Sequence, residues 1–308
     1  MDKKKYELGI VIVSYHSDEL TIKMIREQLS KVPEDYLLVV VNNGATMDSS
    51  RTIAEAIGGT LITDTEAEDD FSSRRFVIHN IENSGFAKGN NMGINFLVDH
   101  FEVGYLLFSN NDIELVDKDV TTRLIAKIKS NNEIGIIGPK VVGLDGNCQS
   151  PENYVPFWDE ILWMTWGRFL HIKSRKTFDR NSAPEGFYYR VMGSFFLTSC
   201  ADYLKCGEMD ENTFLYGEEV ILSERMKRIG KKAYYLPSVS VIHAHGQTTS
   251  KYINLIRGSK ITYKSITYYF KTYRGVSSFS IFLSKLLFFP YIYLQYAFRK
   301  AAALKSRS

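Results

Sequence analysis

Residues 105–115 read YLLFSNNDIEL, an apolar run that ends in two amides and a carboxylate. A continuous run of large apolar residues predicts a strand buried on both faces, as in a parallel sheet covered by helices. Asn110, Asn111 and Asp112 then follow the point where this strand leaves the core. Two interpretations are open. These residues either form a turn, because Asn and Asp tolerate left-handed backbone, or they bind a ligand at the strand end.

Strands and helices alternate through the first 140 residues or so. Apolar runs predict strands at residues 8–15, 36–43, 76–81 and 104–110. Helical spacing of apolar residues predicts helices at residues 18–30, 85–100 and 117–130. This alternation predicts an α/β fold with a mostly parallel sheet sandwiched by helices. In open sheets of this kind, ligands bind beyond the carboxyl ends of the strands.

A polar cluster follows each of the four predicted strands. The clusters are Ser14 with Tyr15, then Asn42, Asn43 and Gly44, then residues 83–91, and then Asn110 to Asp112. Because the carboxyl ends of parallel strands share one edge of the sheet, all four clusters fall together. Turns at the opposite edge should be equally polar if turn chemistry were the only cause. The pattern therefore favours a binding site.

The third cluster, NSGFAKGNN at 83–91, opens a predicted helix with glycines, a lysine and amides. Backbone N–H groups at a helix start, together with Lys88 and amides such as Asn91, suit an anion or a hydroxyl-rich group. The sequence has neither GxGxxG after its first strand nor a Walker A motif. A dinucleotide-binding Rossmann site and P-loop ATP hydrolysis are therefore disfavoured.

The composition indicates a globular protein. With 308 residues, 44% of them hydrophobic and 24% charged, the chain can form one large domain or a domain with an appendage. Its three cysteines lack CxxC spacing, which suits a reducing compartment better than a secreted disulfide framework. The N-terminal MDKKKYELGIVIVSY has no small-residue cleavage site and reads as a first strand, not a signal peptide.

The net charge of +3 is unevenly distributed. Residues 225–308 hold 16 Lys and Arg and no Asp or Glu, so the preceding part carries 22 basic against all 35 acidic groups. A basic segment on an acidic body points to an anionic partner. No zinc-ligand spacing or helix-turn-helix pattern indicates nucleic acid.

The tail, residues 251–308, is aromatic as well as basic, and Lys285 and Pro290 interrupt its most apolar part at 278–298. A membrane span needs about 20 apolar residues. Helices that lie on an anionic membrane surface fit the tail better. The alternative is a helical subdomain that packs on the core or against a second copy of the chain.

Seven motifs together carry a resemblance to a known family. In chain order they read VIVSYHS, VVVNNGATMDSS, NSGFAKGNNMGI, LLFSNNDIEL, GSFFLTS, MDENTFLYGEEVILSERMKRIG and SVIHAHGQTTS. Over about residues 8–250 the chain resembles the inverting GT-A glycosyltransferases of family 2, particularly the rhamnosyltransferase-like branch. The resemblance implies a Rossmann-like catalytic domain at 1–250, followed by the tail.

The resemblance also implies an activity. The enzyme would move a sugar from a UDP- or dTDP-linked nucleotide-sugar to a hydroxyl of a bacterial surface polysaccharide that grows on a lipid diphosphate carrier. It would work in the cytoplasm, as a peripheral protein on the inner face of the cell membrane. Residues 145–190 break the β-α rhythm and carry all three tryptophans. They are interpreted as an acceptor-side loop or lid, or else as a packing segment.

Ligand roles follow from the same resemblance. Asp112 would hold Mg²⁺ or Mn²⁺ against the diphosphate, with His243 as second ligand and His245 ranked after it. The glycine and terminal glutamate of an EF-hand loop are absent. Donor-binding positions fall at the strand ends and the helix start, at Ser14, Tyr15, Asn42, Asn43, Gly85, Lys88, Asn91, Asn110 and Asn111.

The catalytic base implied by the resemblance is Glu219, with Glu218 as the other candidate. Acids in a first helical turn also simply favour the helix dipole. Three positions depart from the family: Glu219 replaces Asp, Ile221 replaces a common acid, and Asn42 replaces an Asp that faces the nucleobase. An Asn can still accept a pyrimidine N3–H. The missing acids at Asn42, Asn110 and Ile221 leave a catalytically silent scaffold protein as the rival. A nucleotidyltransferase is disfavoured because no basic signature loop lies near the first strand.

Overall fold

A ten-stranded sheet organises the computed structural model, which describes residues 3–63, 72–167, 178–244 and 254–305. The strand order is β3-β4-β2-β1-β5-β9-β7-β10-β6, and β8 pairs with β10. The strands are β1 (Lys5–Ser14), β2 (Tyr36–Asn43), β3 (Thr60–Ile62), β4 (Arg75–Asn80), β5 (Glu102–Ser109), β6 (Ile113–Leu115), β7 (Ile134–Gly143), β8 (Gly186–Tyr188), β9 (Phe195–Ser199) and β10 (Lys232–His243). Only β6, β8 and β9 run against the common direction. The predicted α/β fold with a mostly parallel sheet is confirmed.

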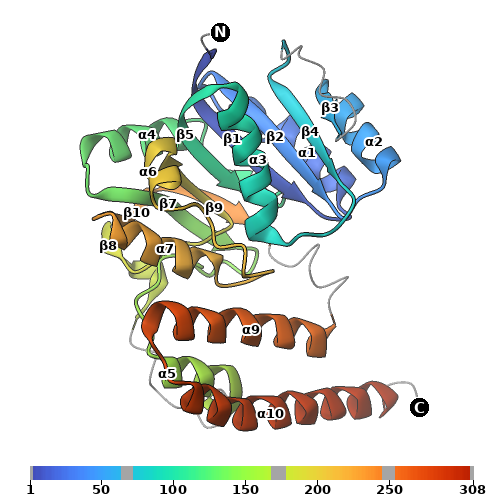
Figure 1. Cartoon of the computed structure of the whole chain (residues 1–308), viewed down its shortest axis with the longest axis vertical. Coiled ribbons are helices and arrows are strands. Elements are labelled where there is room, and N and C mark those ends of the chain that lie inside the picture. Colours follow the sequence, from blue (N-terminus) through green and yellow to red (C-terminus); the bar gives the residue numbers. More distant parts are fainter. Residues whose placement is uncertain (1–2, 64–71, 168–177, 245–253, 306–308) are drawn as a thin grey trace.

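Helices cover both faces of the sheet (Figure 1). The α-helices are α1 (Asp18–Glu27), α2 (Met47–Ile57), α3 (Phe86–His100), α4 (Val120–Ser130), α5 (Phe157–Leu162), α6 (Cys200–Lys205), α7 (Glu218–Arg228), α9 (Leu255–Arg274) and α10 (Ser278–Lys305). Short helical turns occur at η1 (Leu29–Lys31), η2 (Trp163–Gly167) and η4 (Arg180–Ser182). One core contains α1, α2 and α4, and the core on the other face contains α3, α6 and α7.

The continuous apolar runs reflect this double covering. Successive side chains of a strand point to opposite faces, so Ile10 and Ile12 of β1 enter the first core while Val11 enters the second. The four predicted strands correspond to β1, β2, β4 and β5, and their ends differ by at most three residues from the predicted ones.

The later strands were not predicted, because their pairing is non-local. Strand β9 inserts antiparallel between β5 and β7, which interrupts the parallel order. In β10 the register against β7 shifts between Leu236 and Ser240, where Pro237 has no N–H for the ladder.

The carboxyl edge of the sheet gathers the strand ends. In register, Ser14 of β1 lies beside Asn42 of β2, and Asn42 lies beside His79 of β4. On the other side of the sheet, His243 at the end of β10 lies between Gly143 of β7 and Ile113 of β6. The strand register therefore places these polar residues at one edge of the sheet, as expected.

Helices α5, α9 and α10 lie beyond this carboxyl edge (Figure 1). They form a third core with α7, in which Ile221 packs with Phe270 of α9, Phe157 of α5 and Phe288 of α10. Ile221 is fully buried there. An apolar residue at this position is thus explained by packing. The domain boundary at residue 250 stays a prediction, since α9 shares its core with α7.

Candidate functional site

Asp112 and His243 meet where β6 pairs with the end of β10. The backbone N–H of Ala244 donates to the carbonyl of Asp112 at 3.0 Å. This pairing brings the Asp112 Oδ1 to 3.3 Å from the His243 Nε2. The two side chains are only 9% and 3% exposed. His245 lies outside the described residues.

Gln149 orients the imidazole of His243. The His243 Nδ1 lies 2.7 Å from the Gln149 Oε1, which is an acceptor, so Nδ1 carries the proton. The Nε2 lone pair is then directed at the carboxylate of Asp112. A second group that fixes the tautomer in this way is typical of metal-bound histidines.

The donor set fits a divalent cation. A carboxylate oxygen and an imidazole nitrogen face each other, and the Asn110 Nδ2 lies 3.4 Å from the same Nε2. No group of three or more His, Cys, Asp or Glu suited to a metal occurs in the described part of the chain. Asp112 and His243 could therefore hold Mg²⁺ or Mn²⁺ only with further oxygen ligands from a phosphate group or water.

Ser14 and Asn111 hold α1 against the sheet edge. The Ser14 Oγ lies 2.9 Å from the Thr21 Oγ1, and the Asn111 Nδ2 donates to the hydroxyls of Ser17 and Thr21 at 2.7 and 2.8 Å. Both side chains are buried. Because these groups bond inward, their effect on a ligand would come through the position of the neighbouring Asp112.

Asn43 ties β2 to the loop that precedes α3. Its Oδ1 accepts from the Asn80 Nδ2 and the Ser84 N–H, and its Nδ2 donates to the Asn83 Oδ1 and the Gly85 carbonyl, at 2.8 to 3.1 Å. All these bonds are internal. Asn43 therefore sets the shape of this loop.

Asn42 differs from its neighbour. Its Nδ2 donates to the Ser49 and Ser50 hydroxyls at 2.8 and 3.1 Å. Its buried Oδ1 has no hydrogen-bond partner among the described residues. A buried acceptor without a donor costs free energy, so this oxygen is suited to receive an N–H from a ligand. Tyr15 lies nearby, with its ring beside Gly44.

Gly85 and Asn91 join α3 to the loop before α7. Gly85 has φ +89°, and a Cβ there would lie 2.4 Å from the Phe214 carbonyl oxygen, so only glycine fits. The Asn91 Oδ1 accepts from the Tyr203 hydroxyl at 2.6 Å, and its Nδ2 donates to the Met209 carbonyl at 3.0 Å. Lys88 is exposed on the first turn of α3. Gly85 and Asn91 thus fix the position of α3 against the loop that precedes α7.

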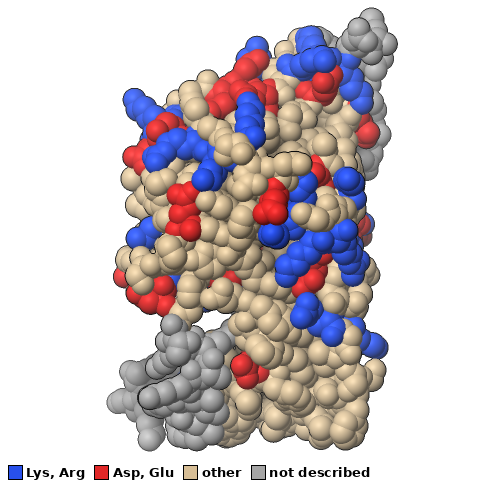
Figure 2. Space-filling model, turned by 90° about the vertical axis from the view of Figure 1, so that its left-hand side faces the viewer, with Lys and Arg blue, Asp and Glu red and all other residues tan. Residues whose placement is uncertain are grey.

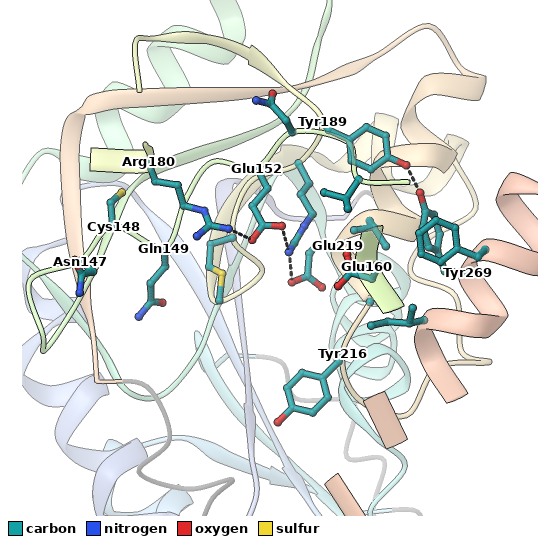
Figure 3. A pocket seen from close by; sticks show the side chains of 18 of the residues that line it. Asn147, Cys148, Gln149, Glu152, Glu160, Arg180, Tyr189, Tyr216, Glu219 and Tyr269 are labelled. Carbon is teal, nitrogen blue, oxygen red and sulfur yellow. Dashed lines mark hydrogen bonds and ion pairs between the residues drawn. The ribbon is translucent and has the colours of Figure 1, made fainter. Parts of the chain in front are cut away.

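A pocket of about 530 Å³ is bounded by residues that include Gln149 and Glu219 (Figure 3). Gln149, which orients His243, is part of its wall. Its other walls come from the 145–190 segment, the start of α7 and helix α9. Glu219 faces into the pocket, whereas Tyr189 and Tyr269 meet through their hydroxyls at its rim. The described part of 145–190 therefore lines the pocket and, through α5, also packs in the third core.

Charged side chains form a continuous network in this pocket. The Arg190 Nη1 donates to the Glu219 Oε1 at 2.8 Å, and Arg190 also pairs with Glu152. Arg180 donates to the other oxygen of Glu152 at 2.6 Å. Burial opposes the charged form of Arg190, but Glu152 and Glu219 outweigh it and raise the pKa of this guanidinium. The network holds Glu219 in one orientation.

Glu218 has a different environment from Glu219. Its side chain is 4% exposed, and its Oε1 has no hydrogen-bond partner within the described ranges. Burial, with a smaller contribution from the charge of Glu219, raises the pKa of Glu218 to about 8. Burial therefore favours the neutral acid form of Glu218, whereas the Glu219 side chain pairs with Arg190.

The sequence matches one family model over most of this architecture. Residues 9–192 match the model for glycosyl transferase family 2. The chain belongs to this family. It is a glycosyltransferase with a GT-A fold, as the seven motifs predicted. The match ends before Glu218 and His243, so the roles of these residues stay predictions.

Curated relatives of this glycosyltransferase include enzymes of glycan assembly. The low-salt glycan biosynthesis hexosyltransferase Agl10 of Haloferax volcanii is 26% identical over 240 residues, which cover 77% of this chain and 67% of the relative. The N-acetylglucosaminyl-diphospho-decaprenol L-rhamnosyltransferase of Mycobacterium tuberculosis is 28% identical over 96 residues, 31% of this chain and 28% of the relative.

A solved structure shares the fold. The crystal structure of GalNAc-T7 with UDP, GalNAc and Mn²⁺ has a TM-score of 0.57 at 14% sequence identity. The match covers 86% of this chain and 48% of that one. At this level of identity the likeness shows the fold alone.

Sequence reasoning missed Gln149, Glu152 and Arg190. Gln149 meets His243 across 94 residues of sequence, and Arg190 meets Glu219 across 29. The only local signal was the position of Arg190 three residues before the GSFFLTS motif. That signal does not indicate which carboxylate the arginine contacts.

We expect Arg190→Met to lower the free energy of unfolding by about 2 kcal/mol, because Glu219 would lose its partner in a mostly buried site. Arg180→Met is the matched control. Its side chain is 40% exposed against 19% for Arg190, so solvent should limit the loss to less than about 1 kcal/mol. Urea denaturation of both variants measures this. Equal losses would contradict a special role for the Arg190–Glu219 pair.

Glu218 should make stability depend on pH. Its folded-state pKa of about 8 lies above the ordinary value of 4.5, so between these values the folded state holds a proton that the unfolded state has released. Stability should therefore be greatest at low pH within this range and fall as pH rises, by up to about 1.4 kcal/mol per pH unit. Glu218→Gln should flatten this slope in denaturation curves from pH 5 to 8. An identical slope in the variant would show that Glu218 does not hold the proton.

Proposed function

We propose that this glycosyltransferase moves a sugar, with inversion, from a UDP- or dTDP-linked donor to a hydroxyl of a growing glycan. The observation that supports this most is the position of Gln149. Its carbonyl oxygen binds His243, while the same side chain lines the pocket that contains Glu219. One residue thus joins a pair suited to a cation to a pocket with a candidate base.

The donor would lie along the carboxyl edge of the sheet. Asp112 and His243 would hold Mg²⁺ or Mn²⁺, which would supply positive charge to the leaving diphosphate. The unpartnered Oδ1 of Asn42 supports a nucleobase with an imide N–H, as uracil and thymine have. Asn110 and Lys88 complete the polar groups near the donor.

The transfer requires one proton to move within the pocket. The acceptor hydroxyl loses its proton to the Glu219 carboxylate, and its oxygen forms a bond to the anomeric carbon. The bond from that carbon to the diphosphate breaks on the opposite face, and the nucleoside diphosphate departs with the bonding electrons. Arg190 would hold the Glu219 carboxylate in an orientation that faces the acceptor.

The acceptor side suits a sugar chain. The pocket presents tyrosine rings together with charged groups, and a volume of about 530 Å³ is in the usual range for a ligand site. The mycobacterial relative is named for an acceptor sugar on diphospho-decaprenol. By analogy we propose a glycan on a lipid diphosphate as acceptor, used on the cytoplasmic face of the membrane in surface polysaccharide synthesis.

A screen of nucleotide-sugars tests this function. The protein is mixed with UDP-, dTDP- and GDP-sugars, with and without Mn²⁺, and both donor hydrolysis and the melting temperature are measured. We expect a uridine or thymidine donor to raise the melting temperature only when the metal is present. A donor that stabilises the protein without being turned over, even with acceptor glycans present, would favour the scaffold alternative. A response to GDP-sugars alone would show that the donor does not carry uracil or thymine as its nucleobase.

A further inference from the structure

Helix α10 exposes a continuous apolar stripe. Most of its exposed apolar side chains are three, four or seven residues apart, which places them along one side of the helix. They include Phe279, Phe282, Leu283, Leu286, Tyr293 and Phe298, which are 36 to 70% exposed. At 1.5 Å per residue the stripe is about 30 Å long. On the face drawn in Figure 2, the end of the molecule that contains α9 and α10 carries few charged side chains compared with the sheet domain.

The opposite side of α10 is fixed to the body of the protein. Phe288, Tyr291 and Ile292 are buried in the third core, and the Ser284 hydroxyl lies 2.7 Å from that of Tyr263 on α9. The segment Ser278–Ala301 is long and apolar enough to cross a membrane, with mean hydropathy 1.3. Crossing would remove its inner side from this core. The contacts with α9 therefore favour a helix that lies flat.

Charge distinguishes between two occupants of the stripe. Lys285, Arg299 and Lys300 are exposed on α10, and residues 225–308 contain no Asp or Glu. In a two-fold dimer the same patch meets itself, so these cations would face one another without carboxylates from this region. An anionic lipid surface supplies an acyl-chain region in which the stripe can be buried and phosphates that can pair with the cations.

We propose that α10 docks flat on an anionic phospholipid bilayer and holds the pocket close above it. Helices α9 and α5 separate the two, because both pack against α10 in the third core while Tyr269 and Phe270 of α9 and Glu160 of α5 line the pocket. One layer of packed helices is about 10 Å thick. If the proposed function holds, an acceptor on a lipid diphosphate would reach Glu219 from the headgroup level without leaving the bilayer.

Flotation of the full chain with vesicles tests the docking. The vesicles contain phosphatidylcholine alone, or phosphatidylcholine and phosphatidylglycerol in equal parts. We expect binding to the mixed vesicles, weakened by high salt. The double variant Phe282→Ser with Leu286→Ser should bind at least about tenfold more weakly, because it removes two exposed apolar side chains. The matched control, Val116→Ser with Leu204→Ser, alters exposed apolar residues of the sheet domain and should bind as the wild type does.

The outcomes separate this proposal from the proposed function. Wild-type melting temperature and donor hydrolysis in both double variants would show that fold and donor chemistry are intact, so a loss of flotation then supports docking. Equal flotation of the α10 variant and the wild type would overturn it. The wild-type chain could instead bind neither type of vesicle and form a dimer that the α10 variant does not form. That result would show that the stripe contacts a second copy of the chain.

Discussion

Glu219→Gln should lower turnover by about 10²–10⁴-fold and leave donor binding nearly unchanged, because general-base catalysis typically contributes that factor. Glutamine keeps the size of the side chain, and its Oε1 can still accept from the Arg190 Nη1, which lies 2.8 Å from Glu219. The pocket should therefore keep its shape and lose only a proton acceptor. Single-turnover rates with saturating donor measure the chemical step, and calorimetric titration with the donor measures binding.

Glu218→Gln is the matched control for this prediction. Burial raises the pKa of Glu218 to about 8, so at neutral pH the wild-type side chain is mainly a neutral acid. A glutamine resembles that neutral acid, and we expect a loss in turnover of less than about tenfold. If the two losses were reversed, Glu218 would be the base. If neither variant lost turnover, a carboxylate base would be wrong for this enzyme.

Much of the fold was predictable because its signals are local. A strand buried on both faces needs a continuous apolar run, and β1, β2, β4 and β5 all have one. A parallel sheet places their polar ends at one edge whatever the details of packing. The position of Asp112 at that edge therefore followed from the run YLLFSNNDIEL together with the alternation of strands and helices around it.

The direction of each polar side chain was not predictable. Asn42 and Asn43 are adjacent and share a residue type. Both the Nδ2 and the Oδ1 of Asn43 have hydrogen-bond partners, whereas the Asn42 Oδ1 has none among the described residues. Asn91 likewise bonds inward, to Met209 and Tyr203. Which amide faces a ligand depends on loops that are distant in sequence.

The two adjacent glutamates show the same limit. Residues that follow each other on a helix point about 100° apart, so the GEE motif predicts that only one of them faces the reacting centre. Burial then makes Glu218 a weak acid, whereas Arg190 pairs with Glu219. That arginine lies on a segment that breaks the β-α rhythm, and periodicity carries no information about its contacts.

Asp112→Asn should weaken Mn²⁺-dependent binding of the nucleotide diphosphate by at least about 100-fold, since groups that merely orient a metal ligand already contribute about 10–100-fold. The substitution preserves size and removes the only carboxylate within contact of the His243 Nε2 among the described residues. A neutral amide is a much weaker ligand for a hard cation. Calorimetric titration with UDP and dTDP, at several Mn²⁺ concentrations, measures the effect.

Two further variants make the metal prediction specific. Gln149→Ala removes the acceptor of the His243 Nδ1–H and should cost about 10–100-fold, because the imidazole would lose its fixed orientation. Glu114→Gln alters an exposed carboxylate two residues beyond Asp112 and should leave the affinity unchanged. The expected order of loss is thus Asp112→Asn, Gln149→Ala and then Glu114→Gln. Unchanged Mn²⁺-dependent affinity in Asp112→Asn would show that the cation does not bind at this strand end. An equal loss of affinity in Glu114→Gln and Asp112→Asn would show that only the general surface charge matters.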